Sequence, residues 1–289
     1  MNNRRIATAF IAAVVASSAA APAQAQLFSN FGSLEHNLDN LVGQALDMMP
    51  PGIHGIRVGL GPVMQPNFFG DSSKSTRVAP VISLRYRNFI EVDNNAIRVN
   101  FLGNWGRMGS NTSAWSTGPT INIDWGRATS DSPKLVGVGG ISTSFEMGAY
   151  VAYRVSNARY RVRARHDVAG ATGGWLVDGQ IDYRVVDARR LFVNIGAQVT
   201  WADSKWMGTW FGITPGQSAA SGLPIYRASS GLRDASVRLS AEYLLNDRWS
   251  VLGTVGYARM LSGAANNPLV KMRGSRNQPT AGAFVIYAF

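Results

Sequence analysis

The last eleven residues of the chain, 279–289, form an alternating segment that ends on an aromatic residue with no polar tail. One face carries apolar or small side chains at every second position: Ala281, Ala283, Val285, Tyr287 and Phe289. The segment is about as long as a tilted membrane strand, which needs roughly 9–11 residues. An aromatic strand at the edge of a soluble sheet would pair with other chains, whereas a closed membrane barrel has no free edge. The ending therefore favours a transmembrane β-barrel over the buried closing strand of a soluble sheet.

Residues 1–25 have the three parts of a secretory signal. A charged start with two arginines precedes an apolar run over 6–16, and Ala-Gln-Ala at 23–25 is a small-x-small cleavage motif. We expect export and cleavage after Ala25, which leaves a mature chain of 264 residues. A retained anchor helix is the alternative, but the apolar run is short for a membrane span, which needs about 20 residues.

The composition narrows the ways in which this chain can enter a membrane. No other stretch approaches the roughly 18 apolar residues of a membrane helix, so a membrane protein of this composition has to be a barrel. The chain has no cysteine, so neither a lipid-anchored cysteine nor a disulfide framework is available. Beyond the signal, 26 basic residues outnumber 17 acidic ones. An exported protein is not expected to bind nucleic acid through this positive charge. Lipopolysaccharide, anionic solutes and acidic periplasmic partners remain as candidates.

Most of the mature sequence alternates apolar side chains with polar or small ones, the period of a two-faced β-strand. A soluble sandwich alternates as well, but a packed core could not hold charged residues on the second face of nearly every strand. Aromatic residues recur near strand ends, as membrane interfaces require: Tyr86, Trp105, Trp125, Tyr153, Trp175, Trp201, Trp249 and Tyr257. Short connections alternate with long ones over 127–140, 202–233 and 262–278, as in outer-membrane barrels. The sequence thus predicts an all-β, antiparallel transmembrane barrel over 55–289.

The number of strands follows from the alternating segments. Eleven can be counted, near 55–64, 77–87, 96–106, 117–126, 141–154, 158–168, 174–186, 190–201, 234–245, 248–260 and 279–289. Bacterial single-chain barrels have an even number of strands. We expect twelve, with a short additional strand around 89–92 ahead of the Asp93-Asn94-Asn95 turn; ten is the alternative.

Residues 27–49 break the pattern, because apolar residues recur there at helical spacing until a Pro-Pro-Gly sequence ends the helix. The polar face carries Glu35, Asp39 and Asp47 and no lysine or arginine, whereas helices that lie on anionic membranes are usually basic. We expect 26–54 to form an amphipathic helix and linker that suits a basic barrel interior, as a plug, or a periplasmic partner. A loosely ordered extension is the alternative.

The most distinctive charge pattern is a run of four arginines at every second position: Arg159, Arg161, Arg163 and Arg165. They project from one face of a strand whose other face is apolar, so they have to line the lumen. A hairpin centred near 171–172 would pair Arg165 with Asp178 and Arg161 with Asp182, and would leave the other two arginines less compensated. One interpretation is an anion-attracting ladder that sets pore selectivity. We favour the other, a salt-bridge network that fills and rigidifies a narrow barrel.

Signals for an enzyme are weak. The chain has three histidines, His36, His54 and His166, and no pair has the spacing of metal ligands. No nucleophile motif and no phosphate-cradling glycine loop occurs. We expect no catalytic residues, no metal and no cofactor, with a serine–histidine lipid hydrolase as the weaker alternative.

Two regions resemble the MipA/OmpV family of outer-membrane proteins, and the resemblance covers roughly 55–289. Residues 58–61, 69–71 and 79–82 look like the family's first hairpin, although Phe-Phe-Gly-Asp-Ser stands where the family usually has Tyr-x-Gly-Ser-Asp. The loop at 200–233 carries the most specific motif: Asp203, Trp206, Met207, Phe211, Gly212, Thr214, Ser221, Gly222 and Tyr226. Its aromatic residues are too many to stay solvated, so we expect the loop to fold over or into the lumen. A self-packed extracellular loop is the alternative.

These resemblances imply the membrane into which the protein is assembled and its function. Val285, Tyr287 and Phe289 resemble the C-terminal assembly signal of outer-membrane barrels, which implies recognition by the barrel-assembly machinery. MipA-type members are scaffolds that bridge a lytic murein transglycosylase and a bifunctional peptidoglycan synthase. The resemblance therefore implies a non-enzymatic outer-membrane scaffold for peptidoglycan-remodelling enzymes. A narrow anion-preferring channel and a surface adhesin are the alternatives.

Overall fold

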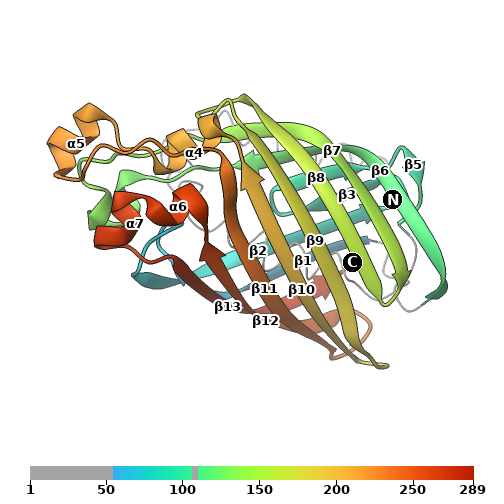
Figure 1. Ribbon diagram of the computed structural model, residues 1–289. Helices are drawn as coiled ribbons and strands as arrows, with labels where there is room; N and C mark the ends of the chain where they lie inside the picture. The colour runs from blue at the N-terminus through green and yellow to red at the C-terminus, as the bar shows by residue number, and fades with distance from the viewer. Residues whose placement is uncertain (1–54, 106–109) are drawn as a thin grey trace, which may run out of the picture.

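The computed structural model describes residues 55–105 and 110–289, so the signal segment 1–25 and the helix and linker expected at 26–54 lie outside the described residues. The described chain forms one antiparallel sheet that is closed into a barrel (Figure 1). The strand order is β4-β3-β2-β1-β13-β12-β11-β10-β9-β8-β7-β6-β5, and a further pairing of β4 with β6 closes the barrel. Neighbours in the barrel are thus neighbours in the sequence, apart from β1, which pairs with β13.

The strands are β1 (Gly55–Pro66), β2 (Lys74–Tyr86), β3 (Ile90–Asp93), β4 (Ala96–Val99), β5 (Leu102–Gly103), β6 (Ser110–Asp124), β7 (Ser144–Ser156), β8 (Ala158–Ala169), β9 (Trp175–Asp187), β10 (Leu191–Ala202), β11 (Gly231–Leu244), β12 (Trp249–Met260) and β13 (Asn277–Ala288). The helices are η3 (Thr129–Asp131), η4 (Pro133–Leu135), α4 (Ser204–Phe211), α5 (Pro215–Ser221), α6 (Ser262–Asn266) and α7 (Pro268–Arg273). Within the described ranges, no helix has the length and apolar character needed to cross a membrane.

The barrel has 12 strands, because β4 and β5 are two parts of one interrupted strand. Both pair with β6: Ala96 lies opposite Asn122, and Leu102 lies opposite Thr117. The expected strand number is confirmed, and the short strand expected near 89–92 is β3.

The interruption between β4 and β5 changes which side chains face the lumen. Phe101 and Leu102 are consecutive and both exposed, whereas a regular strand exposes every second residue. A slip by one residue moves all later side chains to the opposite face. Trp105, expected in the lipid-facing girdle, is therefore buried inside the barrel, where its Nε1 donates a hydrogen bond to the hydroxyl of Tyr150 at 3.2 Å. The girdle prediction was wrong at this position.

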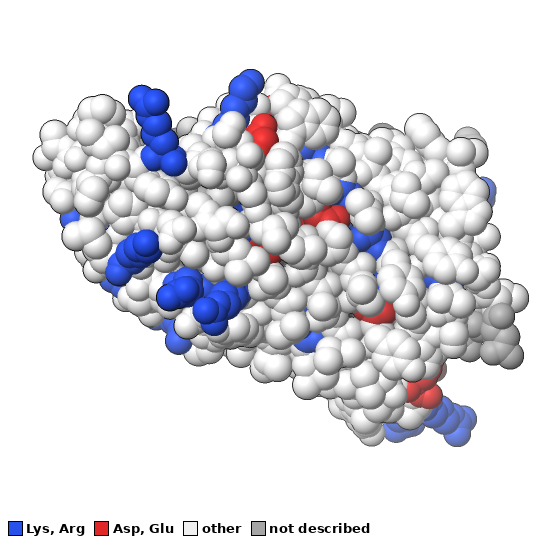
Figure 2. All heavy atoms as spheres, in the orientation of Figure 1, with Lys and Arg blue, Asp and Glu red and all other residues white. Residues whose placement is uncertain are grey.

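The other strands alternate as predicted. In β9, Asp178, Gln180 and Asp182 are buried inside the barrel, while Ile181 and Tyr183 are exposed outside. On the face seen in Figure 2, the outer surface between the two ends is mostly uncharged. Exposed aromatic residues frame this surface, with Tyr86, Tyr153, Tyr160, Tyr183, Tyr243 and Trp249 towards one end and Phe145, Trp175, Trp201 and Tyr257 towards the other. An uncharged band between two aromatic belts is the outer surface of a membrane-spanning barrel.

Short turns and long loops lie at opposite ends of the barrel, as expected. The terminal rim, our name for the end that holds Gly55 and Phe289, carries tight turns such as the one at Asn157. The loop rim carries the connections 67–73, 125–143, 203–230 and 261–276 and all the described helices (Figure 1). Outer-membrane barrels keep short turns in the periplasm and long loops outside the cell. The terminal rim is therefore the periplasmic end.

Strand β13 closes the barrel, because it pairs with both β12 and β1. Val285 lies on the outer face, opposite Leu60 of β1. The ring of Tyr287 makes edge contacts with Trp249 and with Phe289, at centroid distances of 4.9 Å each. The three residues of the expected assembly signal thus sit on the outer surface at the seam of the barrel, where the aromatic ending of the chain joins the terminal belt.

The closure between β1 and β13 depends on Gly61. A Cβ atom at this position would lie 1.8 Å from the carbonyl oxygen of Ala283 and 2.7 Å from the Cα of Phe284. We predict that Gly61→Val prevents closure and abolishes the heat-dependent gel shift that marks a folded barrel. The matched control is Gly253→Ala in β12, whose added Cβ meets no atom within 4 Å. A Gly61→Val protein that shows a normal gel shift would contradict this account of the seam.

Candidate functional site

The four arginines of β8 line the lumen together with two aspartates of β9. All four arginine side chains are buried, and Asp178 and Asp182 are fully buried. Asp178 Oδ1 lies 3.1 Å from Arg163 Nε and 3.0 Å from Arg165 Nη2. Asp182 Oδ2 lies 2.8 Å from Arg159 Nη2. The structure thus brings the six ladder residues together on two neighbouring strands.

The register of this hairpin differs from the prediction by two residues. Arg159 lies opposite Asp182, Arg161 opposite Gln180 and Arg163 opposite Asp178. The carboxylate of Asp167, at the end of β8, accepts hydrogen bonds from the backbone of Thr172 and Gly173 and so organises the turn. The predicted contact of Arg165 with Asp178 is present as a diagonal ion pair. The expectation that Arg159 and Arg163 are less compensated was wrong, because each faces an aspartate directly.

The ladder is part of a wider network of lumenal ion pairs. Arg165 also contacts Glu146 of β7, and Asp182 also binds Arg238 of β11 at 2.7 Å. Other pairs join Arg57 to Glu242, Arg85 and Arg98 to Glu91, Arg98 to Asp93, and Arg184 to Asp187. Among the described residues, eleven arginines and ten carboxylates are buried. Buried charges of nearly equal number, many of them joined in ion pairs, make a nearly neutral interior instead of a surplus that would attract anions.

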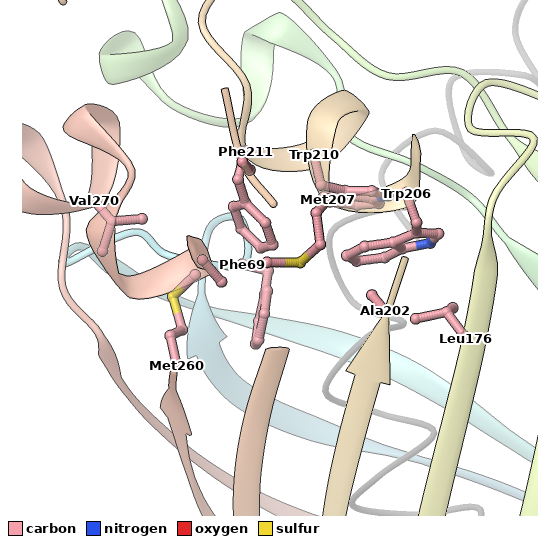
Figure 3. Close-up of a cluster of buried hydrophobic side chains, with 11 residues drawn as sticks. Phe69, Leu176, Ala202, Trp206, Met207, Trp210, Phe211, Met260 and Val270 are labelled. Atoms are coloured by element: carbon pink, nitrogen blue, oxygen red, sulfur yellow. The ribbon is translucent and has the colours of Figure 1, made fainter. Parts of the chain in front are cut away.

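The loop rim is covered by a hydrophobic cap built mainly from the loop at 203–230. Trp206, Met207, Trp210 and Phe211 of α4 are all buried (Figure 3). The rings of Trp206 and Trp210 stack at 5.3 Å with an interplanar angle of 16°. They pack with side chains from the 67–73 loop, the strand ends, the 261–276 loop and the last part of their own loop: Phe69, Leu176, Ala202, Ala228, Met260, Ala264 and Val270. The loop therefore folds over the lumen, as one of the two sequence interpretations expected.

The remaining motif residues fix the path of this loop. The side chain of Asp203 accepts a hydrogen bond from Trp206 N at 2.8 Å and so caps α4, while Thr214 caps α5 in the same way with Gln217. Gly222 ends α5 in the left-handed region, at φ 74°, where glycine avoids the steric cost of a side chain. Gly212 is the C-cap of α4, Ser221 is the last residue of α5, and the Tyr226 hydroxyl donates a hydrogen bond to Gly263 O at 2.9 Å. Burial raises the pKa of Tyr226 above its usual value.

Two arginines that the sequence analysis did not single out contact the cap, Arg233 from β11 and Arg127 from the 125–143 connection. The guanidinium of Arg233 lies over the rings of Trp206 and Phe69, at 5.0 and 5.1 Å from their centroids. Arg127 lies 5.9 Å from the Trp210 ring and donates a hydrogen bond to Trp210 O at 3.1 Å. Burial lowers the pKa of Arg127 to about 10, partly offset by the nearby charge of Asp131. Neither residue stands in a motif or a regular charge pattern, so no sequence signal pointed to them.

A polar latch connects the other loops at the same rim. Lys134 Nζ lies 2.7 Å from Asp71 Oδ1 and donates hydrogen bonds to the hydroxyls of Ser72 and Ser73 at 2.6 and 3.0 Å. Arg273 of α7 donates hydrogen bonds to Lys134 O and to Ser221 O. The four long connections of the loop rim are thus tied to one another.

The described part of the chain offers no arrangement suited to catalysis by a metal. It contains no group of three or more His, Asp or Glu residues that could hold a metal ion. His166 stacks on Trp175 at 4.8 Å, and its Nδ1 lies 3.1 Å from Gly174 O, so it belongs to the aromatic belt. His36 and His54 lie outside the described residues.

The chain is similar to a known protein family and to several known proteins. A family model described as MltA-interacting protein MipA matches residues 58–289. The chain is 23% identical over 200 residues to the outer membrane protein Omp26La of Vibrio anguillarum, covering 69% of this chain and 74% of that protein. It is 24% identical over 199 residues to the outer membrane protein OmpV of Vibrio cholerae serotype O1, covering 68% and 72%. A solved NanC porin covers 80% of this chain and 100% of its own, at 8% identity and a TM-score of 0.43.

The buried ion pairs of the ladder predict that removing a buried carboxylate destabilises the protein more than removing a partly exposed one. We expect Asp178→Asn to lower the free energy of unfolding by about 3–5 kcal/mol, because it leaves two buried arginines without their shared carboxylate. Asp187→Asn is the matched control, since its pair with Arg184 is partly exposed and such pairs contribute about 0–1 kcal/mol. Urea unfolding in detergent micelles measures both. Equal losses for the two variants would contradict the structural interpretation of the ladder.

The cap predicts a similar contrast between two apolar residues of one loop. Trp206→Ala should lower the free energy of unfolding by about 3–5 kcal/mol, because it empties a fully buried site. Ile225→Ala removes a side chain that is 58% exposed. This variant should change the free energy of unfolding by less than about 0.5 kcal/mol. Thermal melts of both variants make the comparison, and a Trp206→Ala protein as stable as the control would argue against a packed cap.

Proposed function

Because the chain belongs to the MipA family of outer-membrane proteins, we propose that it is a non-enzymatic barrel that scaffolds peptidoglycan-remodelling enzymes at the outer membrane. The family description names an interaction with MltA, a murein transglycosylase. The natural partners of this chain are therefore a murein transglycosylase and the peptidoglycan synthase that works with it.

The sealed loop rim is the observation that carries this proposal. The stacked pair Trp206 and Trp210 and the latch at Lys134 join all four long connections over the lumen. A barrel that is closed on the outside has no through-path for a solute, so its useful surface is the one that faces the periplasm. The near balance of buried charge inside the barrel supports the same conclusion, because a selective anion pore needs an excess of positive charge along its path.

The terminal rim offers a polar surface for such partners. The turn between β9 and β10 exposes Asp187, Arg189 and Arg190, and the turn between β11 and β12 exposes Asp247 and Arg248. Short turns hold these side chains in fixed positions, and their mixed charges suit the polar rim of a protein interface. The β-strands behind them are rigid, so partner contacts at these turns cost little conformational entropy.

Crosslinking in cells tests the scaffold. A photo-crosslinking amino acid in place of Arg190 or Asp247 should capture a murein hydrolase or synthase. The matched control places it at Ile225, an exposed position of the opposite rim, where no periplasmic enzyme should be captured. Failure to capture any periplasmic cell-wall enzyme from either turn would contradict the proposal.

Planar-bilayer recording tests the alternative of an anion-preferring channel. The cap predicts that the purified protein shows no steady single-channel openings. Deletion of the cap residues 204–221 should produce openings, because it removes α4 and α5 from the mouth. Steady chloride-selective openings of the unmodified protein would contradict the scaffold and favour the channel.

A further inference from the structure

Exposed charge is distributed unevenly between the two ends of the barrel. Among the described residues, the loop rim exposes six basic side chains: Lys74, Lys205, Arg227, Arg259, Lys271 and Arg276. The exposed carboxylates of the described chain, Asp187 and Asp247, lie at the terminal rim. The half-buried carboxylates of the loop rim, Asp131 and Asp203, accept hydrogen bonds from backbone N–H groups. The outer end of the barrel is therefore strongly basic.

Four of these basic residues come from neighbouring parts of the sheet, and we call them the basic collar: Lys74, Arg259, Lys271 and Arg276. Two of them lie where β12 meets β13. Arg259 is opposite Asn277, the first residue of β13. The carbonyl of Arg276 accepts a hydrogen bond from Met260 N at 2.9 Å. Figure 2 shows basic side chains gathered over these loop-rim ends of β12 and β13.

The other two collar residues are held beside this pair by the packing of the loops. Helix α7 buries Val270 in the cap and exposes Lys271. Just after α7, Gly274 forms a β-bridge with Asp71, three residues before Lys74. The 261–276 connection and the start of β2 therefore lie side by side. Within the described ranges, none of the four collar side chains forms an ion pair.

The collar lies at the outer edge of the membrane-spanning surface. Tyr257, an exposed member of the aromatic belt near the loop rim, is two residues before Arg259 on the same face of β12. The arginine is thus about 6–7 Å farther out along the strand. Four residues from Arg259 and from Lys74, in the direction of the membrane interior, Val255 and Val78 are exposed on the same faces. Basic side chains therefore stand directly above an apolar wall.

This arrangement matches a lipid with a negatively charged head. The loop rim faces the outside of the cell, where the outer leaflet of the outer membrane consists of lipopolysaccharide. Its lipid A anchor carries phosphate groups at the membrane surface and acyl chains below them. Arginine binds phosphate through charge-assisted and often bidentate hydrogen bonds, and lysine adds a mobile point charge. Clusters of basic residues next to a membrane are typical of binding to anionic lipids.

From these observations we propose that the basic collar binds the phosphate groups of lipid A. Arg259 and Arg276 contact phosphate, Lys74 and Lys271 add positive charge on either side, and the acyl chains lie along the apolar outer wall of β12, β13 and β2. The site goes beyond the scaffold function and does not rest on it, because the scaffold uses the turns of the terminal rim.

Native mass spectrometry of the purified mature protein in detergent micelles, titrated with diphosphoryl lipid A, tests the site. EDTA in the buffer removes divalent cations that could bridge phosphate to other groups. We expect R259Q/R276Q to weaken lipid A binding by about tenfold, because two charge-assisted phosphate contacts are lost. The matched control, R189Q/R190Q, removes the same charge from exposed arginines of the terminal rim. It should change binding by less than about twofold, since distant surface charges are screened by salt.

Three further measurements decide which feature is recognised. The heat-dependent gel shift checks that both variants are folded. Equal weakening in the two variants, or none in either, would overturn the site. Dephosphorylated lipid A that binds as tightly as the diphosphoryl form would overturn phosphate as the recognised group. Inorganic phosphate that competes with lipid A at equal concentration would overturn the lipid as the occupant and indicate a simple anion site. Lipid A that stays bound to the protein isolated from cells, and is lost in R259Q/R276Q, would support the proposal.

Discussion

The closed ring of backbone hydrogen bonds is the constraint on which the rest of this structure depends. In hydrocarbon an unpaired N–H or C=O group costs several kcal/mol, so the sheet has to return to its first strand. The pairing of β13 with β1 does this, and it needs glycine at position 61, where no side chain fits against Ala283. Once the ring is closed, two kinds of side chain are left to place: apolar ones facing lipid and polar ones crowded into the lumen.

Crowding explains why the lumen is a network of ion pairs. Charged groups removed from water are tolerated when they are paired and hydrogen-bonded, and the two aspartates of β9 supply partners to three arginines on β8 and one on β11. The same rule for buried charged groups applies to the cap at the loop rim. Arg233 of β11 and Arg127 of the 125–143 connection lie on the tryptophan faces of the cap, so charged side chains and the apolar cap are joined by cation–π contacts. Both features stiffen the barrel.

Much of the fold follows from the sequence because a barrel wall obeys a period of two. The alternation predicted twelve strands, their approximate limits and the inward direction of the arginine ladder. It failed at Trp105, because the slip at Phe101 and Leu102 reverses the faces. It also missed the hairpin register at Asp182, since the turn that sets it depends on hydrogen bonds made by the side chain of Asp167. The cap residues were marked by a family motif, whereas Arg127 and Arg233 act only through three-dimensional contacts.

The central claim is that this barrel is closed to the outside by its cap. A single cysteine in place of Ser240, which is buried in the lumen, reports on this directly because the chain has no other thiol. A membrane-impermeant thiol reagent added outside intact cells should leave it unlabelled, and should label it once Trp206→Ala has loosened the cap. Labelling of the capped protein at the rate of an exposed cysteine at Ile225 would contradict the account.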